Sequence, residues 1–288
     1  MNLTRPDGPD VATKPSRRNL GAIAMFAGYA AAIMPVHAAA INTPSDGLIT
    51  GMVSYPSNGF DLPAFVARPA ARGRKPVVLV VSEVFGLHEY VRDMCRRLAR
   101  LGYVAIAPAF FVRVADPAPL TDFAAIMPIV SAANNAQVMG DITATIAWLD
   151  KQRFVAKKRI AITGFCWGGT VVWMASAMTD RIKAGVAWYG RMVARPGSTE
   201  VRKYPADIAG DLKSPVLGLY AENDSGIPLP TVDAMRAALI AAGNTTSTIV
   251  VYPGTEHGFH ADYRPAYNET AAKDGWAAML AWFKANGV

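Results

Sequence analysis

The stretch IAITGFCWGG, residues 160–169, decides the fold that we expect of this chain. It opens with an apolar run typical of a buried strand and ends in glycines where a helix can begin. Gly164, Cys166 and Gly168 give the pattern G-x-Nuc-x-G, a tight turn that presents a nucleophile between strand and helix. Glycines are required there because side chains would collide across the turn. Serine usually stands at the centre of such a turn, so the cysteine is the feature to explain.

Similar apolar runs recur along the chain and predict a mostly parallel sheet. They are PVVLVVSE, YVAIAP, RIAITGF, AGVAWYG, SPVLGLYAEN and TSTIVVYPG, each separated by a helical pattern or a longer loop. Continuous runs of this kind indicate strands covered on both faces by helices. We expect the helices at residues 88–101, about 134–152, 168–178, 230–242 and 271–286. Ahead of them, ITGMVSY and FDLPAFVARP flank the turn SNG, which predicts an antiparallel hairpin.

A single α/β domain over residues 41–288 accounts for this pattern. No internal repeat and no second composition regime follows residue 46. Residues 111–133 are the hardest to assign, because they combine prolines with weak periodicity. They favour a lid or irregular excursion over the carboxyl ends of the strands.

Residues 1–40 have the layout of an export signal. Arg17 and Arg18 end a polar, mildly basic start, and no charged residue follows until Asp46. The paired arginines favour the twin-arginine export machinery, with a Sec signal as the alternative. We therefore expect a periplasmic or secreted protein.

The apolar part of this leader is long enough to raise the alternative of an uncleaved membrane anchor. Pro35 and two glycines make it a poor spanning helix, so cleavage is the preferred interpretation. The small-residue run at residues 38–40 offers the peptidase site, and the sequence leaves open a cut after Ala38 or after Ala40.

Composition narrows the class of protein. Of the 288 residues, 52% are hydrophobic and 18% charged, which excludes a disordered chain. The net charge of +7 is spread over scattered basic residues without interleaved aromatics, so no nucleic-acid partner is expected. Two cysteines cannot form a disulfide framework, and Cys95 falls on the apolar face of a predicted helix. Cysteine and histidine show no metal-ligand spacing, so neither a metal nor an organic cofactor is expected.

Two further residues complete a catalytic order. The strand LGLYAEND ends in Asp224 and the strand IVVYPGTEH ends in His257, after Cys166 in the chain. Nucleophile, acid and histidine in this order, each at the carboxyl end of a strand, is the α/β-hydrolase arrangement. Glu222 is the alternative acid. His260 is the alternative histidine, and we expect it to line the pocket.

At these residues the chain resembles the dienelactone hydrolase family, whose α/β-hydrolase fold carries a triad of Cys, His and Asp. Four segments carry the likeness: SEVFGLHEYVRDMCRRLARLGYVAIAP, GFCWGG, YAENDSGIP and YPGTEHGFHADYRPAY. The resemblance implies that Glu83 is the active-site glutamate that manages the thiol proton, and that Val84 donates one oxyanion N–H. The second donor is the backbone N–H of Trp167, which follows the nucleophile directly. Glu83 also ends an apolar strand, where a carboxylate is costly unless it is paired.

The sequence departs from the family at one position. Family members that cleave dienelactone hold the substrate carboxylate with arginines, one of them four residues after the triad histidine, where this chain has Ala261. Arg264 or Arg113 can take over that role through a different loop geometry. Arg264, His260 and Phe85 are the substrate-binding candidates.

These observations favour a hydrolase that cleaves a small-molecule ester or lactone through a Cys166 acyl-enzyme, acting as a monomer or small homo-oligomer. A thioesterase or general carboxylesterase of neutral acyl substrates is the first alternative, because it suits the missing arginine. A non-catalytic binding or thiol redox-sensing protein that kept the fold is the second.

Overall fold

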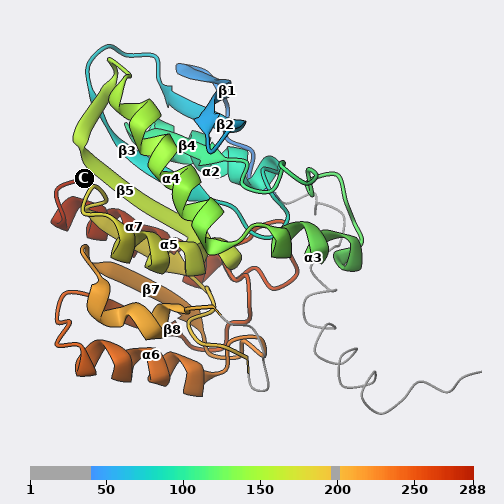
Figure 1. Cartoon of the computed structure of the whole chain (residues 1–288), viewed down its shortest axis with the longest axis vertical. Coiled ribbons are helices and arrows are strands. Elements are labelled where there is room, and N and C mark those ends of the chain that lie inside the picture. Colours follow the sequence, from blue (N-terminus) through green and yellow to red (C-terminus); the bar gives the residue numbers. More distant parts are fainter. Residues whose placement is uncertain (1–39, 196–201) are drawn as a thin grey trace, which may run out of the picture.

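The computed structural model describes residues 40–195 and 202–288, which form one eight-stranded sheet in the order β1-β2-β4-β3-β5-β6-β7-β8 (Figure 1). The strands are β1 (Leu48–Ser57), β2 (Phe60–Pro69), β3 (Lys75–Val81), β4 (Val104–Pro108), β5 (Val155–Phe165), β6 (Ala184–Trp188), β7 (Val216–Ala221) and β8 (Thr248–Tyr252). β2 pairs antiparallel with β1 and β4, and the pairings among β3 to β8 are parallel. The export signal expected over residues 1–40 lies outside the described residues, except for Ala40.

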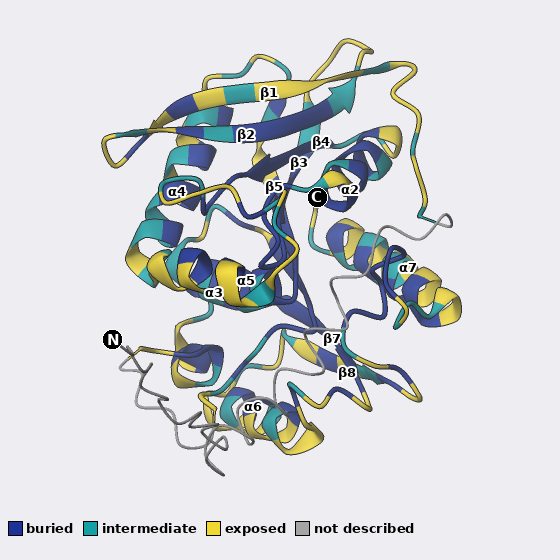
Figure 2. Ribbon diagram, turned by 90° about the vertical axis from the view of Figure 1, so that its right-hand side faces the viewer, coloured by how far each residue is buried: buried dark blue, intermediate teal, exposed yellow. Residues whose placement is uncertain are grey.

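Helices cover both faces of the sheet (Figure 2). α2 and α7 pack on one face, and α4, α5 and α6 pack on the other, with α3 beside them. The helices are α2 (Glu89–Arg100), α3 (Phe123–Ala132), α4 (Asn135–Asp150), α5 (Trp167–Met178), α6 (Leu229–Ala241), α7 (Glu269–Ala285) and the 3-10 helix η1 (Pro205–Asp211). In the described ranges, none of the helices combines the length and apolarity needed to cross a bilayer.

Strand β3 shows why the parallel strands read as unbroken apolar runs. Val77, Leu79 and Val81 point into the cluster under α4 and α5, while Val78 and Val80 point into the cluster under α2 and α7. All five side chains are fully buried. A strand with a core on both sides gains from apolar residues at every position.

The predicted N-terminal hairpin is confirmed. β1 and β2 pair from Leu48↔Pro69 to Ser57↔Phe60, so Asn58 and Gly59 form the two-residue turn. Both adopt positive φ, 49° and 74°, the backbone that such a hairpin turn needs.

The expected excursion at residues 111–133 is half helical, so this prediction was wrong for its second part. Helix α3 begins after Asp122, whose side chain accepts a hydrogen bond from the N–H of Ala124 at 2.9 Å, and it continues through Pro128. Its apolar periodicity is weak because only Ile126, Ile129 and Val130 are buried. A short, half-exposed helix with an internal proline leaves little pattern in the sequence.

Candidate active site

Cys166 stands on a strained turn between β5 and α5. Its backbone lies at φ 54° and ψ −116°, a conformation that side chains rarely adopt. Its N–H donates to the carbonyl of Trp188 at 3.0 Å, and its own carbonyl accepts from Gly169 at 2.9 Å. A Cβ at Gly168 would lie 2.4 Å from the carbonyl oxygen of Val81, and one at Gly164 would lie 2.4 Å from that of Gly168. The two glycines therefore let helix and strands approach closely enough to hold the turn.

The expected oxyanion donors flank this turn. Trp167 is the first residue of α5, and Val84 lies in the loop between β3 and α2. In the described part of the chain, neither backbone N–H is used in a loop or cap hydrogen bond to another backbone carbonyl. The indole of Trp167 is fixed against Phe111, with ring centroids 4.7 Å apart. Both amides are thus without a competing backbone acceptor of this kind, as oxyanion donors require.

His257 and Asp224 form the pair that the chain order indicates. His257 Nδ1 lies 2.6 Å from Asp224 Oδ2. The other carboxylate oxygen of Asp224 accepts the N–H groups of Gly226 and Ile227, at 2.8 and 3.0 Å. Asp224 is buried, so these contacts fix a charged group that orients the imidazole. Glu222, the alternative acid, instead accepts the N–H of Gly254 at 2.8 Å.

Glu83 is a buried carboxylate with three side-chain partners. The hydroxyl of Tyr263 donates to Oε2 at 2.5 Å, Arg264 Nη2 lies 2.9 Å from Oε1, and His88 Nε2 lies 3.4 Å from Oε2. Burial by itself would raise the pKa of Glu83, but Arg264, then His88 and Tyr263, lower it to about 2. Glu83 is therefore ionised at neutral pH and forms an ion pair with Arg264.

Arg264 is the candidate arginine that the structure brings to the site. It is buried, its guanidinium carbon lies 5.0 Å from the ring centroid of Phe85, and its Nη2 lies 2.9 Å from Glu83 Oε1. Ala261, at the position of the family arginine, is fully buried and has no charged group to offer a substrate. Arg113 is committed elsewhere, because both of its terminal nitrogens lie 2.6 Å from the carboxylate of Asp141.

His260 lies behind the site, within the core. Its Nδ1 lies 2.6 Å from the hydroxyl of Tyr90, and its ring stacks on Phe165 with centroids 5.3 Å apart. Burial first, and then Arg97, lower the pKa of His260 to about 3, so the ring is neutral. This position fits packing of the loop rather than the pocket lining that the sequence suggested.

Tyr189, His88 and Tyr263 are site residues that sequence reasoning missed. Tyr189 follows β6 with φ 38°, and its ring centroid lies 5.1 Å from that of His257. Its hydroxyl is fully buried without a hydrogen-bond partner among the described residues, and burial first, then the charge of Glu83, raise the pKa of this hydroxyl. The one available signal was position, since Tyr189 directly follows a parallel strand at the edge where sites gather.

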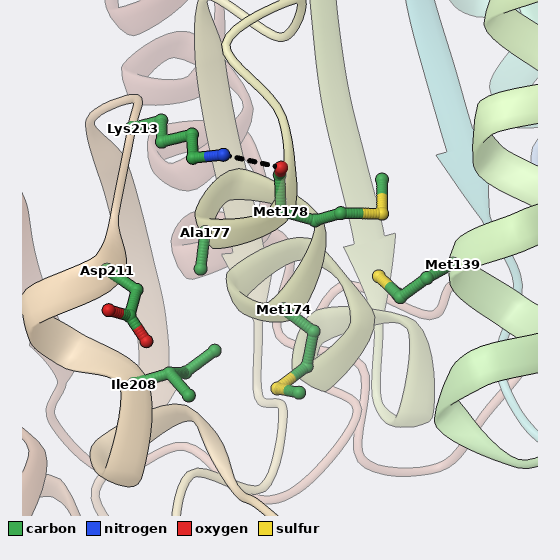
Figure 3. A pocket seen from close by; sticks show the side chains of 7 residues that line it. All are labelled: Met139, Met174, Ala177, Met178, Ile208, Asp211 and Lys213. Carbon is green, nitrogen blue, oxygen red and sulfur yellow. Dashed lines mark hydrogen bonds between the residues drawn. The ribbon is translucent and has the colours of Figure 1, made fainter.

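The described residues contain no group of three or more His, Cys, Asp or Glu side chains that could hold a metal ion. An open cavity of about 470 Å³ lies apart from the site, between α4, the later turns of α5 and the η1 region (Figure 3). Met139, Met174 and Met178 line it, and Lys213 on its rim donates to the carbonyl of Met178 at 2.8 Å. None of the site residues lines this cavity.

A mostly parallel sheet whose central strand leads into a strained nucleophile turn, with acid and histidine on later strands, defines an α/β-hydrolase. Within that class, residues 62–287 match the dienelactone hydrolase family, and the chain belongs to it.

The relatives agree over most of the chain. A protein of Methylorubrum extorquens, provisionally named carboxymethylenebutenolidase, is 46% identical over 275 residues, which cover 95% of this chain and 94% of the relative. A protein of Escherichia coli K12 with the same provisional name is 44% identical, covering 90% and 96%. A crystal structure provisionally named dienelactone hydrolase from Klebsiella pneumoniae superposes with a TM-score of 0.78 at 48% identity, covering 82% and 98%.

Proposed function

We propose that this protein hydrolyses a carboxylic ester or lactone through an acyl-enzyme on Cys166. The observation that carries the proposal is the strained turn at Cys166, placed at the same sheet edge as the His257–Asp224 pair. The ring of Tyr189, which directly follows β6 at this edge, lies against His257 with centroids 5.1 Å apart. The relatives provisionally named carboxymethylenebutenolidase support a lactone as the substrate class.

The chemistry follows from these positions. The Cys166 thiol gives its proton to His257, and sulfur attacks the acyl carbon, whose oxygen accepts the N–H groups of Val84 and Trp167. The acyl carbon–oxygen bond then breaks, and His257 returns its proton to the leaving oxygen; in a lactone this oxygen stays attached and the ring opens. Water next gives a proton to His257 and attacks the thioester, which releases the acid and regenerates the thiol.

We expect Arg264 to determine whether the site prefers anionic or neutral substrates. Its ion pair with Glu83 is buried, so an anionic substrate that reaches Arg264 competes with Glu83 for one guanidinium. Weakening that pair raises the pKa of Glu83 toward its ordinary value and leaves a buried carboxylate less well paired, which is a cost for an anionic substrate. A neutral acyl substrate leaves the pair intact, and Ala261 in place of the family arginine favours this second candidate.

We also propose that the enzyme acts outside the cytoplasm, after the twin-arginine route has exported it. The support lies in the sequence of residues 1–40. Export of the already folded protein would protect a cysteine nucleophile from oxidation, because Cys166 and Cys95 are both buried and free in the fold.

Hydrolysis of a dienelactone beside a neutral aryl ester tests the activity, using protein from Ile41 onward. Cys166→Ala should abolish turnover and the acyl adduct seen by intact mass, whereas Cys95→Ala should keep both. Lactone turnover supports Arg264 as the anion partner, and turnover of the neutral ester alone favours the carboxylesterase. If neither substrate is hydrolysed and no acyl adduct forms on Cys166, the proposal is contradicted.

A further inference from the structure

The first described residues lie along helix α2 as a strap. The N–H of Thr43 donates to Asp93 Oδ1 at 2.6 Å, and its carbonyl accepts Arg96 Nε at 2.8 Å. Arg97 Nη2 lies 3.4 Å from the carbonyl oxygen of Ile41. The strap, residues 41–43, is therefore held to α2 by three charged side chains.

The same helix holds the loop that carries the active-site residues. Asp262 is buried and forms an ion pair with Arg97, which also contacts Asp93 at 2.6 Å. Asp262 stands next to Tyr263 and Arg264, the two loop residues that contact Glu83. The Arg97 pair is the salt bridge, within the described residues, that ties this loop to α2.

The strap reaches this ion pair through Ile41. Arg97 Nη2 joins the carboxylate of Asp262 to the carbonyl oxygen of Ile41, which lies 3.4 Å away, and the backbone nitrogen of Ile41 lies close enough for its amide to lower the pKa of Asp262. Ile41 itself is 49% exposed. A cut after Ala40 would place a new α-ammonium at that nitrogen. Residues 38–40 read Ala-Ala-Ala, the A-x-A pattern that a peptidase cleaves directly before Ile41.

The charges around this point are unbalanced in the described structure. The carboxylates of Glu89, Asp93 and Asp262 surround Arg96 and Arg97, so acidic groups outnumber basic ones by one. Burial raises the pKa of Asp262, although Arg97 and the Ile41 amide oppose it. Tyr90 and Tyr267 are the other titratable groups coupled to Asp262, and both are neutral at physiological pH. One further positive charge would balance the charges of this cluster.

We propose that cleavage of the leader after Ala40 completes the active-site loop, because the new α-ammonium of Ile41 binds Asp262. Asp262 is then a positioning residue: it holds Tyr263 and Arg264 in place against Glu83 through two cations. The proposal extends the export proposal, and its physical test does not require that the enzyme be active.

The pH dependence follows from the sign of the shift. An ion pair with Asp262 raises the pKa of the ammonium in the folded protein above about 7.7–8.0, the range of an unperturbed α-amine. The stabilisation is then fully present below about pH 7.7 and is lost as the pH rises through the raised pKa. A pair worth one pKa unit shifts Tm by about 2–4 °C at this chain length.

The test compares three N-termini in the Cys166→Ala background, so that hydrolysis plays no part. One protein begins at Ile41, one begins at Ala38, and one begins at Ile41 with the amine acetylated. We expect the first to melt about 2–4 °C higher than the others at pH 7, with the difference gone by about pH 10.5. We expect its amine to titrate above the usual range, followed by pH-dependent acylation and intact mass.

Asp262 supplies the matched control. Asp262→Asn should abolish the advantage of the Ile41 terminus, and Asp262→Glu should restore part of it. With Cys166 present, the Ala38 terminus should raise KM about two- to tenfold with little change in kcat, because Arg264 rather than His257 loses its support. Identical melting curves for all three termini, or an advantage that persists in Asp262→Asn, would overturn the proposal; if Asp262→Asn does not fold, the acetylated terminus decides.

Discussion

Glu83 shows how one residue sets the state of this site. A fully buried carboxylate is costly, and here Arg264, His88 and Tyr263 offset the cost at short range. Glu83 and His88 both lie in the loop between β3 and α2, whereas Tyr263 and Arg264 come from the loop between β8 and α7. The sequence could indicate that Glu83 needs a partner, because it ends an apolar strand, but not which partners the fold would supply.

Glu83→Gln should therefore destabilise the protein by about 3–5 kcal/mol at pH 7, because it leaves Arg264 buried without its counter-charge. The pKa of Glu83 is lowered from 4.5 to about 2, so its contribution is present above pH 4.5 and lost as the pH falls toward 2. Urea unfolding at pH 7 and pH 3 should show a smaller gap between the variant and the parent at pH 3. Adding Arg264→Met should recover part of the loss, and an equal gap at both pH values would contradict this account.

Tyr189 combines a positive φ with a buried hydroxyl that has no hydrogen-bond partner in the described structure. Such a hydroxyl costs about 1–3 kcal/mol, so we expect it to bind substrate or an intermediate beside His257. Tyr189→Phe should keep or raise Tm and lower kcat/KM by about 100-fold. Tyr220→Phe, which removes a buried hydroxyl bonded to Trp173, is the control and should lower Tm instead. Full activity in Tyr189→Phe would leave the hydroxyl without a role.

At the scale of elements, the sequence predicts the parts that have a strong period. The six parallel strands and the hairpin follow from apolar runs and turn residues, although β8, at the edge of the sheet, is only partly buried. The five expected helices appear as α2, α4, α5, α6 and α7, with ends shifted by a residue or two. Helix α3 could not be predicted from the sequence, because Pro128 and the small number of buried positions weaken its helical pattern of apolar residues. The positions of Asp224 and His257 can be predicted from the strand ends alone. Tyr263 and His88 cannot, because they join the site through contacts with Glu83 that depend on the tertiary fold.

The contact between α5 and β3 depends on Gly168. A Cβ there would lie 2.4 Å from the carbonyl oxygen of Val81 and 2.7 Å from that of Ser82, and neither backbone atom can move without shifting β3. Gly168→Ala should cost several kcal/mol and greatly reduce the yield of folded protein, as thermal unfolding would measure. Gly51→Ala, in β1 with open space around the new methyl group, should be nearly neutral. Equal tolerance of the two changes would mean that the elbow is looser than its contacts indicate.

For the whole molecule, the fold encloses both thiols. Cys95 is fully buried on the inner face of α2, where burial raises the pKa of its thiol, and Cys166 is 5% exposed. A chain that crosses a membrane unfolded would bring both cysteines into an oxidising compartment together, whereas a folded one keeps them apart. Under the proposed function, the export route therefore decides whether the Cys166 thiol stays reduced.

Replacing Arg17 and Arg18 with lysine should stop export of the folded protein through the twin-arginine route and leave it uncleaved in the cytoplasm. Cell fractionation and intact mass measure this, and Arg5→Lys, in the same leader, is the control that should export normally. Thiol labelling after denaturation should find two free cysteines in the exported parent. Normal export of the lysine variant would point to the Sec route, and that route should then leave a fraction of molecules with a Cys95–Cys166 disulfide and no acylation at Cys166.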